Sequence, residues 1–118
     1  MANPVVHWEI GGRDLEKLGW FYGELFGWQP QPAGPDYRLV EASPPGIGGG
    51  LIEMEPHVTI YVLVADADAT LQRVRDLGGK VLRTPERVPG FGRFAVFEDI
   101  EGNVVGLFEE IDALEPAE

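Results

Sequence analysis

The sequence has no cysteine, little positive charge and no long hydrophobic run, and each shortage excludes a class of protein. Without cysteine, the 118 residues can form neither a disulfide nor a thiolate metal site. No segment approaches the ~20 consecutive apolar residues that span a bilayer, and the N-terminal residues lack the features of a signal peptide. We therefore expect a soluble, cytoplasmic protein that has no membrane partner.

Basic residues are few compared with acidic ones. Nine Lys and Arg residues stand against 20 Asp and Glu residues, which gives a formal net charge of -11. Such a surface repels phosphate backbones, so no nucleic-acid partner is expected. The same charge attracts cationic ligands, or it serves solubility alone. The length predicts a single domain over residues 1–118 with a core of its own.

A strand followed by a helix occurs twice, about fifty residues apart. Alternating apolar residues predict strands at 5–10 and 58–64, and apolar residues three and four apart predict helices at 14–26 and 66–77. A shift of 52 positions superposes the two copies, with an aspartate at each helix start and a glycine after each helix end: Asp14 on Asp66 and Gly27 on Gly79. One supersecondary unit is therefore predicted to occur twice.

Three further strands are predicted after each helix. They lie near 28–32, 37–41 and 51–55 in the first copy, and near 80–83, 93–98 and 104–109 in the second. The glycine-rich stretch 43–50 is predicted to be a flexible loop. It is not predicted to bind phosphate, because it lacks the Gly-Lys-Ser/Thr ending of a phosphate-binding loop. We thus expect an α+β fold of two βαβββ units, about 4–55 and 57–110, followed by an acidic tail at 111–118 that frays.

The two faces of each first strand are expected to differ. Side chains alternate along a strand, so the apolar faces should lie under the helices. These faces hold Val6, Trp8 and Ile10 in the first copy and Val58, Ile60, Val62 and Val64 in the second. The helix stripe that covers the first face is Leu15, Leu18, Tyr22 and Leu25. The opposite faces, with His7, Glu9, Thr59 and Tyr61, should line a cleft round which the mixed sheet curves as a half-barrel.

Two motifs resemble those of a known family. Phe-Tyr-Gly-Glu-Leu-Phe-Gly-Trp at 21–28 and Phe-Glu-Asp-Ile-Glu-Gly-Asn at 97–103, together with the duplicated unit, are similar to the vicinal-oxygen-chelate superfamily. That superfamily holds glyoxalase I, extradiol dioxygenases, fosfomycin-resistance enzymes and bleomycin-resistance proteins. The resemblance implies a homodimer, and it leaves the reaction open because this fold hosts several chemistries.

The resemblance also implies where metal ligands would lie. In metal-using members each unit offers one ligand from its first strand and one from its last. His7 stands at the first of these positions, but its equivalent in the second unit is Thr59, a poor ligand, and the final glutamate is replaced by Gly106. The fourth position falls on Met54, with Glu53 or Glu55 one residue away.

We therefore expect no bound metal and no other cofactor. The alternative is a divalent ion (zinc, nickel, iron or manganese) held by His7, Glu53, His57 and Glu109. His57 lies two residues before Thr59 on the same face, or is an exposed residue at the start of its strand. Glu109 faces the other way in a regular strand, so a bulge would be needed to turn it inward.

Three functions stay open, and the sequence names no substrate. The protein binds or sequesters a small molecule without a metal, or it is a metal-dependent lyase, isomerase or dioxygenase, or it is a metal-free enzyme. In the last case His7 is the base and Glu9 its partner. The candidate ligand-binding residues are His7, Thr59, Tyr61, Phe108 and Arg93. Arg93 is included because an arginine beside Phe91-Gly92 can close over an anion, although surface arginines are common.

Overall fold

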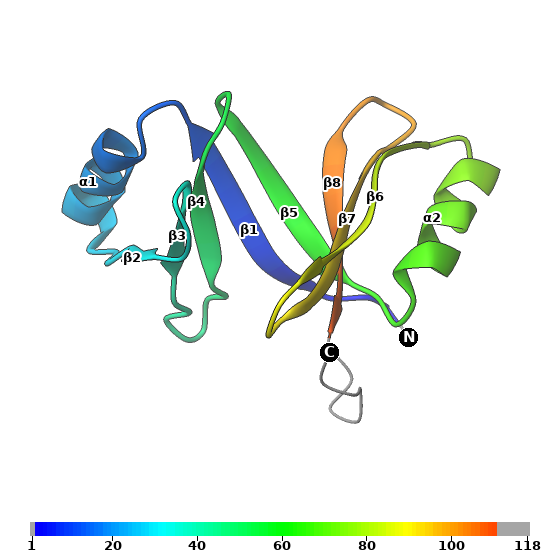
Figure 1. The fold of residues 1–118 in the computed structure, drawn as a ribbon, viewed down its shortest axis with the longest axis horizontal. Coiled ribbons are helices and arrows are strands. Elements are labelled where there is room, and N and C mark those ends of the chain that lie inside the picture. Colours follow the sequence, from blue (N-terminus) through cyan, green and yellow to red (C-terminus); the bar gives the residue numbers. More distant parts are fainter. Residues whose placement is uncertain (1, 111–118) are drawn as a thin grey trace. The chain divides into compact units, whose positions relative to one another are not determined.

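A computed structural model describes residues 2–110. The acidic tail predicted at 111–118 lies outside the described residues. The described chain contains two helices and an eight-stranded mixed sheet whose hydrogen-bonded order is β2-β3-β4-β1-β5-β8-β7-β6 (Figure 1). The elements are β1 (Val5–Gly12), α1 (Leu15–Phe26), β2 (Gln31–Pro32), β3 (Tyr37–Val40), β4 (Gly49–Glu53), β5 (His57–Leu63), α2 (Ala67–Asp76), β6 (Lys80–Val88), β7 (Gly92–Glu98) and β8 (Val104–Glu110). The predicted α+β class is confirmed.

The chain forms two compact units, and we describe each by itself. Val6–Ile60 makes the N-terminal unit, while Tyr61 onward together with the residues through Val5 makes the C-terminal unit, so β5 begins in one and ends in the other. In each unit the first strand pairs in parallel with the last, β1 with β4 and β5 with β8. The other pairs within each unit are antiparallel. Both units therefore have the βαβββ arrangement that the repeat predicted.

The two helices begin at equivalent positions. The Asp14 carboxylate accepts from the backbone N–H of Lys17, and the Asp66 carboxylate accepts from that of Ala69. Each aspartate thus satisfies a donor that has no partner inside its helix. After α1, Gly27 takes a left-handed conformation with φ 74°, which glycine adopts without steric cost. The two aspartate caps and Gly27 are confirmed as predicted, whereas the left-handed residue after α2 is Gly78, with φ 97°, rather than Gly79.

The core of the N-terminal unit lies between α1 and its sheet. Leu15, Val40 and Leu51 are buried, and the partly buried side chains of Trp8, Ile10, Leu18, Tyr22 and Trp28 pack against them. The rings of Tyr22 and Trp28 stack with centroids 5.3 Å apart. Leu25 was expected in this stripe but is 59% exposed. Those two rings fill the space under the end of the helix, and Leu25 is left outside.

The core of the C-terminal unit lies between α2 and its sheet. It consists of the buried side chains of Val64, Ala67, Leu71, Ala95 and Leu107, with Val62, Val81 and Phe97 packed against them. The predicted burial of Val58 and Ile60 is wrong, because they are 72% and 43% exposed. The hydrophobic cluster under α2 reaches back along β5 only as far as Val62, so the first half of the strand keeps its apolar face uncovered.

The glycine-rich stretch differs from the prediction at its end. Gly49 and Gly50 belong to β4 rather than to a loop, since their backbones pair with Trp8 and Glu9 of β1. A side chain on Gly49 would meet the Trp8 ring, because a Cβ there would lie 2.0 Å from Trp8 Cδ2. Glycine is needed here for close approach, not for flexibility.

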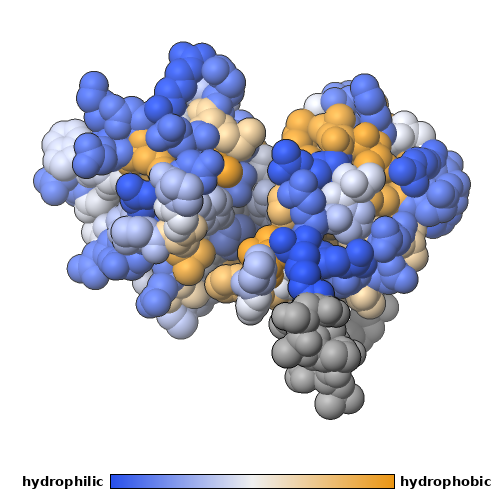
Figure 2. Space-filling model, viewed as in Figure 1, coloured by the Kyte–Doolittle hydropathy of each residue, from blue (hydrophilic) through white to orange (hydrophobic). Residues whose placement is uncertain are grey.

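The visible surface agrees with the acidic composition. Figure 2 shows hydrophilic residues over much of each unit, and the hydrophobic residues form smaller areas within this hydrophilic surface. Within residues 2–110, neither helix is long and apolar enough to cross a bilayer.

Candidate functional site

Each unit has one sheet face that packs against its helix and one that does not; we call the second the helix-free face. In the N-terminal unit, strand register places Glu9, Gly50 and Leu39 in one row across this face. Gly11, Ile52 and Tyr37 form the next row. His7 shares the face with Glu9 because the two are two residues apart on β1.

His7 is held by a tyrosine that the sequence analysis did not single out. The Nε2 atom of His7 lies 2.9 Å from the hydroxyl of Tyr37. Burial lowers the pKa of His7 below its ordinary value, and the nearby charge of Glu9 opposes that effect without reversing it. The imidazole is therefore neutral near pH 7, the form that accepts a proton or binds a metal.

Tyr37 reaches His7 across a glycine. A Cβ on Gly50 would lie 2.0 Å from the Tyr37 hydroxyl oxygen, so the ring occupies the space over that residue. The alternation of side chains along β3 was enough to predict that Tyr37 lies on the helix-free face. It was not enough to predict that the ring crosses Gly50 to reach His7, because that depends on which strands are neighbours.

Glu9 and His57 form a second pair on the same face. Glu9 is 7% exposed, and its Oε1 lies 3.3 Å from Nε2 of His57. His57 Nδ1 donates to the Glu55 carbonyl oxygen at 2.8 Å. The ring lies over Gly11, where a Cβ would be 2.2 Å from Nδ1. His57 is thus half-buried and bonded, where an exposed strand start was one of the predictions.

The helix-free face of the C-terminal unit is aromatic. Register across β5, β8, β7 and β6 gives one row of Leu63, Phe108, Phe94 and Glu86, and a neighbouring row of Tyr61, Gly106, Val96 and Arg83. Tyr61 is 9% exposed, and a Cβ on Gly106 would lie 2.3 Å from its ring carbons. Thr59, two residues before Tyr61 on β5, is 6% exposed.

Arg93 and Glu109 lie on the other side, toward α2. Arg93 Nε and Nη2 donate to the two carboxylate oxygens of Glu109 at 2.8 and 3.0 Å, and Nη2 also donates to Asp68 at 3.1 Å. Glu109 Oε2 accepts from the backbone N–H of Ala67 at 2.8 Å. The hydrogen bonds from Arg93 lower the pKa of Glu109, and the two carboxylates raise that of Arg93. This cluster joins β7 and β8 to the start of α2.

The structure also corrects the alignment of the two last strands. Glu9 pairs with Gly50, and Tyr61 pairs with Gly106. The shift of 52 positions places position 9 on position 61. Gly106 is therefore equivalent to Gly50, not to Met54 as the ungapped shift predicted. The chain between helix and last strand is longer in the second unit, which moves the correspondence by four residues. Neither unit has a side-chain donor at that position.

A divalent-metal site does not fit this arrangement. Glu53 pairs with Gly12 on the helix side of its sheet, opposite to the face of His7, and it is exposed. Glu109 is bound to Arg93 and Ala67. Among residues 2–110, no three His, Asp or Glu side chains are placed to bind one ion together. Metal ligands must converge at about 2.0–2.2 Å, which these side chains do not do.

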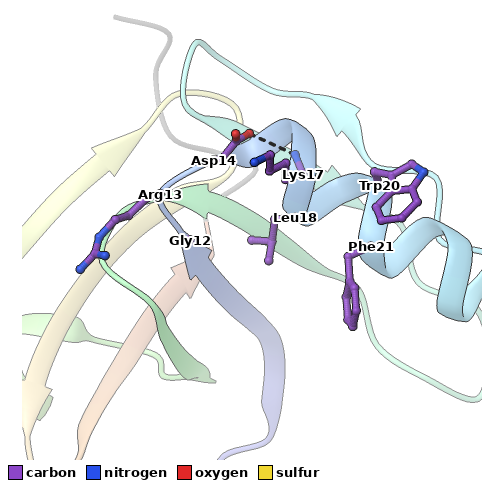
Figure 3. Close-up of a pocket in the computed structure, with 7 residues that line it drawn as sticks. All are labelled: Gly12, Arg13, Asp14, Lys17, Leu18, Trp20 and Phe21. Carbon is purple, nitrogen blue, oxygen red and sulfur yellow. Dashed lines mark hydrogen bonds between the residues drawn. The ribbon is translucent and has the colours of Figure 1, made fainter.

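A shallow hollow lies elsewhere, at the start of α1 (Figure 3). Its volume is about 540 Å³, and it is lined by Gly12, Arg13, Asp14, Lys17, Leu18, Trp20 and Phe21. The lining side chains do not converge: Arg13 points away from Trp20 and Phe21 in Figure 3. Two of its charged side chains already have partners, because Asp14 caps α1 and Arg13 donates to Glu55. The hollow is separate from the predicted site residues.

Comparison with known families decides the family of this duplicated fold. A family model described as the Glyoxalase/Bleomycin resistance protein/Dioxygenase superfamily matches residues 5–107. The chain belongs to this superfamily. The resemblance seen in the two motifs is thereby confirmed.

Individual relatives agree with the family and are longer than this chain. The "Putative glyoxylase CFP32" of Mycobacterium tuberculosis is 35% identical over 81 residues, which are 65% of this chain and 31% of the relative. The "Anthracycline biosynthesis protein DnrV" of Streptomyces peucetius is 32% identical over 124 aligned positions, covering 86% of this chain and 45% of the relative. This chain therefore spans less than half the length of these curated relatives.

Solved structures share the fold. A hypothetical protein, BH1468, from Bacillus halodurans matches with a TM-score of 0.74 at 13% identity, covering 98% of this chain and all of that one. Methylmalonyl-CoA epimerase from Mycobacterium tuberculosis matches with a TM-score of 0.68 at 19% identity, covering 93% of this chain and 89% of that one. At such identities the likeness concerns the fold alone.

Proposed function

We propose that this member of the glyoxalase superfamily binds a small molecule on a helix-free sheet face and uses no resident divalent metal. One observation carries the proposal: the equivalent last-strand positions are glycine in both units, Gly50 and Gly106, and each is covered by an aromatic ring. The place where the family's last-strand ligand would stand is thus filled by Tyr37 in one unit and Tyr61 in the other. Such faces favour contacts with an organic ligand over ion coordination.

The proposed contacts follow from the face on which each side chain lies. The helix-free face of the N-terminal unit offers hydrogen bonds from His7 and Glu9, and that of the C-terminal unit offers apolar area from Tyr61 and Phe108. Thr59, on the helix-free side of β5, supplies a hydroxyl. Arg93 is omitted, because its guanidinium lies on the helix side and binds two carboxylates.

A second function is favoured by the state of His7. A neutral imidazole bonded to Tyr37 is suited to accept a proton from a substrate carbon or hydroxyl. In this case the protein is a metal-free isomerase or lyase in which His7 is the base and Glu9 stabilises the protonated ring. The two functions differ in whether the bound ligand is converted.

Elemental analysis and ligand binding test the first proposal together. Protein purified without chelators should hold well under one zinc, nickel, iron or manganese per chain, and zinc added in a calorimetric titration should bind no tighter to wild type than to His7→Ala. Stoichiometric metal that disappears in His7→Ala would overturn the metal-free proposal in favour of a metal-dependent lyase, isomerase or dioxygenase.

The relatives suggest the first compounds to test. Doxorubicin, an anthracycline with its own fluorescence, should be titrated with wild type and with Phe108→Ala. The hemithioacetal of glutathione and methylglyoxal should be incubated with wild type and His7→Ala. Conversion that requires His7 in metal-free protein would establish the second function.

We further propose a cytoplasmic homodimer, for which sedimentation should give twice the 13.0 kDa of one chain.

A further inference from the structure

The helix-free face of the C-terminal unit presents aromatic rings where no core requires them. The hydrophobic core of this unit lies on the other side of the sheet, because Ala95 and Leu107 face α2. Phe94 and Phe108 lie between these core residues along β7 and β8 and pair directly across the two strands. Cross-strand partners have Cβ atoms about 4.5–5.5 Å apart, so the two side chains leave the sheet at neighbouring positions of this face. Both are partly buried.

Tyr61 extends the aromatic surface by one row. It pairs with Gly106, and its ring lies against that glycine, where a Cβ would be 2.3 Å from ring carbons. A larger residue at position 106 would displace the ring. Tyr61, Phe94 and Phe108 together form what we call the aromatic platform.

A flat cation already lies on this platform. The guanidinium carbon of Arg83 is 5.7 Å from the centroid of the Phe94 ring, within the range of a cation–π contact. Arg83 comes from β6, the last strand in the sheet order, and its side chain is 55% exposed. The guanidinium is planar and delocalised, so it shows which kind of group the ring face accepts.

Carboxylates stand beside the platform. Glu86 is the register partner of Phe94, and Glu98, whose own register partner is Lys80, shares the face of Phe94 four residues along β7. Glu86 is 3.7 Å from Arg83, a loose pair with both side chains more than half exposed. The whole chain carries a formal charge of -11. The overall field, together with Glu86 beside Phe94, therefore favours a ligand of positive charge.

Resting on the proposed function, we infer that the ligand is a planar aromatic cation, which stacks on Phe94 and Phe108 beside Tyr61 and takes the place of the Arg83 guanidinium. Stacking uses the ring faces, and Glu86 is left to pair with the positive charge of the ligand.

The test uses three flat dyes of similar size and different charge. Proflavine is the cation, acridine at pH 8 is the neutral probe, and acridine-9-carboxylate is the anion, each titrated by fluorescence into the 118-residue chain. Proflavine should bind tightest. Phe94→Leu and Phe108→Leu, which keep apolar volume but remove the ring, should each raise its Kd about three- to tenfold. Arg83→Gln, which removes the competing cation, should lower it.

Matched controls separate stacking from general attraction to an acidic protein. Phe91→Leu changes an exposed phenylalanine of the same unit that lies outside the strands, and it should leave the Kd unchanged. Far-UV circular dichroism confirms that each variant is folded. The inference is overturned if Phe94→Leu and Phe108→Leu bind proflavine like wild type, or if the anionic dye binds better.

Failure here is distinguishable from failure of the proposed function. Stoichiometric metal would overturn the metal-free proposal whether or not dyes bind. Metal-free protein that binds doxorubicin but shows no dye discrimination and no effect of the two leucine variants would keep the proposed function and refute the platform as its ligand site.

Discussion

The two units of this chain share one backbone plan and differ in what they place on their helix-free faces. Shifting by 52 superposes Glu9 on Tyr61 and His7 on Thr59, and the register of the last strands superposes Gly50 on Gly106. The N-terminal face is polar, with His7, Glu9, Tyr37 and His57 joined in hydrogen-bonded pairs. The C-terminal face is aromatic.

The difference shows which features the fold requires and which a function requires. Helix caps, buried leucines under the helix and a glycine in the last strand occur in both units, so they belong to the fold. Two histidines, each hydrogen-bonded to a side chain of another strand, occur in one unit, and two phenylalanines at cross-strand positions occur in the other. Because the shared backbone does not demand them, these side chains are the best candidates for a role in ligand binding or proton transfer.

The largest expected effect tests whether the two units are also thermodynamically alike. Leu51→Ala in the N-terminal core and Leu107→Ala in the C-terminal core should each lower the free energy of unfolding by about 2–5 kcal/mol, since both remove fully enclosed side chains. The three tryptophans, Trp8, Trp20 and Trp28, all lie in the N-terminal unit. Urea unfolding should therefore be followed by two probes and the two transitions compared. Tryptophan fluorescence reports on the N-terminal unit, and far-UV circular dichroism reports on both units.

Because β5 belongs to both units, we expect one cooperative transition, with both probes shifted equally by either variant. A Leu107→Ala variant that leaves the tryptophan transition in place and shifts only the dichroism would contradict this, and would show that the units unfold independently.

The two glycines under aromatic rings provide the next comparison. Gly106→Ala should destabilise the protein by about 1–3 kcal/mol, because the new methyl meets Tyr61 at ring carbons that cannot move without the whole side chain. Gly50→Ala should cost less, since it meets the hydroxyl end of Tyr37 first. Gly19→Ala is the control, with its nearest atoms at 3.8 and 4.0 Å. This helical site should gain about 0.5–1 kcal/mol. Equal losses at all three sites would refute the argument.

Glu109 and Glu53 are equivalent by the corrected alignment, yet only Glu109 is paired. Its pKa is lowered chiefly by the hydrogen bonds from Arg93, so its stabilising contribution is present above the ordinary value of 4.5 and is lost as the pH falls through the lower folded value. Glu109→Gln should therefore destabilise at pH 7 and flatten the loss of stability below pH 4.5. Urea titrations at several pH values measure both. Glu53→Gln, at an exposed side chain, should change neither.

Local patterns predicted the order of helices and strands in each unit well, because helix caps and the alternation of side chains depend on neighbouring residues. Asp14, Asp66 and Gly27 occupy the predicted positions. The errors arose where tertiary packing decides. Val58 is exposed because the core under α2 does not reach it, and Leu25 is exposed because rings fill the space below.

The candidate site was predicted in part. His7 and Glu9 were singled out by their place on a strand, and the structure gives each a partner from a distant strand, Tyr37 and His57. Those partners depend on which strands adjoin and on which glycines leave room for a ring. The four-residue difference in the length of the two units hid the equivalence of Gly50 and Gly106, and this misplaced the fourth family ligand.

The smallest expected effect concerns His7, whose polar surroundings have no counterpart at Thr59. Burial lowers its pKa below 6.5 and Glu9 partly restores it, so Glu9→Gln should lower the pKa of His7 further. Because the folded value lies below the unfolded one, the protein loses a little stability as the pH falls from 6.5 through the folded value, and His7→Gln should remove that slope. Proton–nitrogen NMR of the two histidines measures the titration, with His7→Gln assigning the signals. A His7 pKa at or above 6.5, or one that rises in Glu9→Gln, would show that charge outweighs burial on this face. It would also remove the case for His7 as a neutral base.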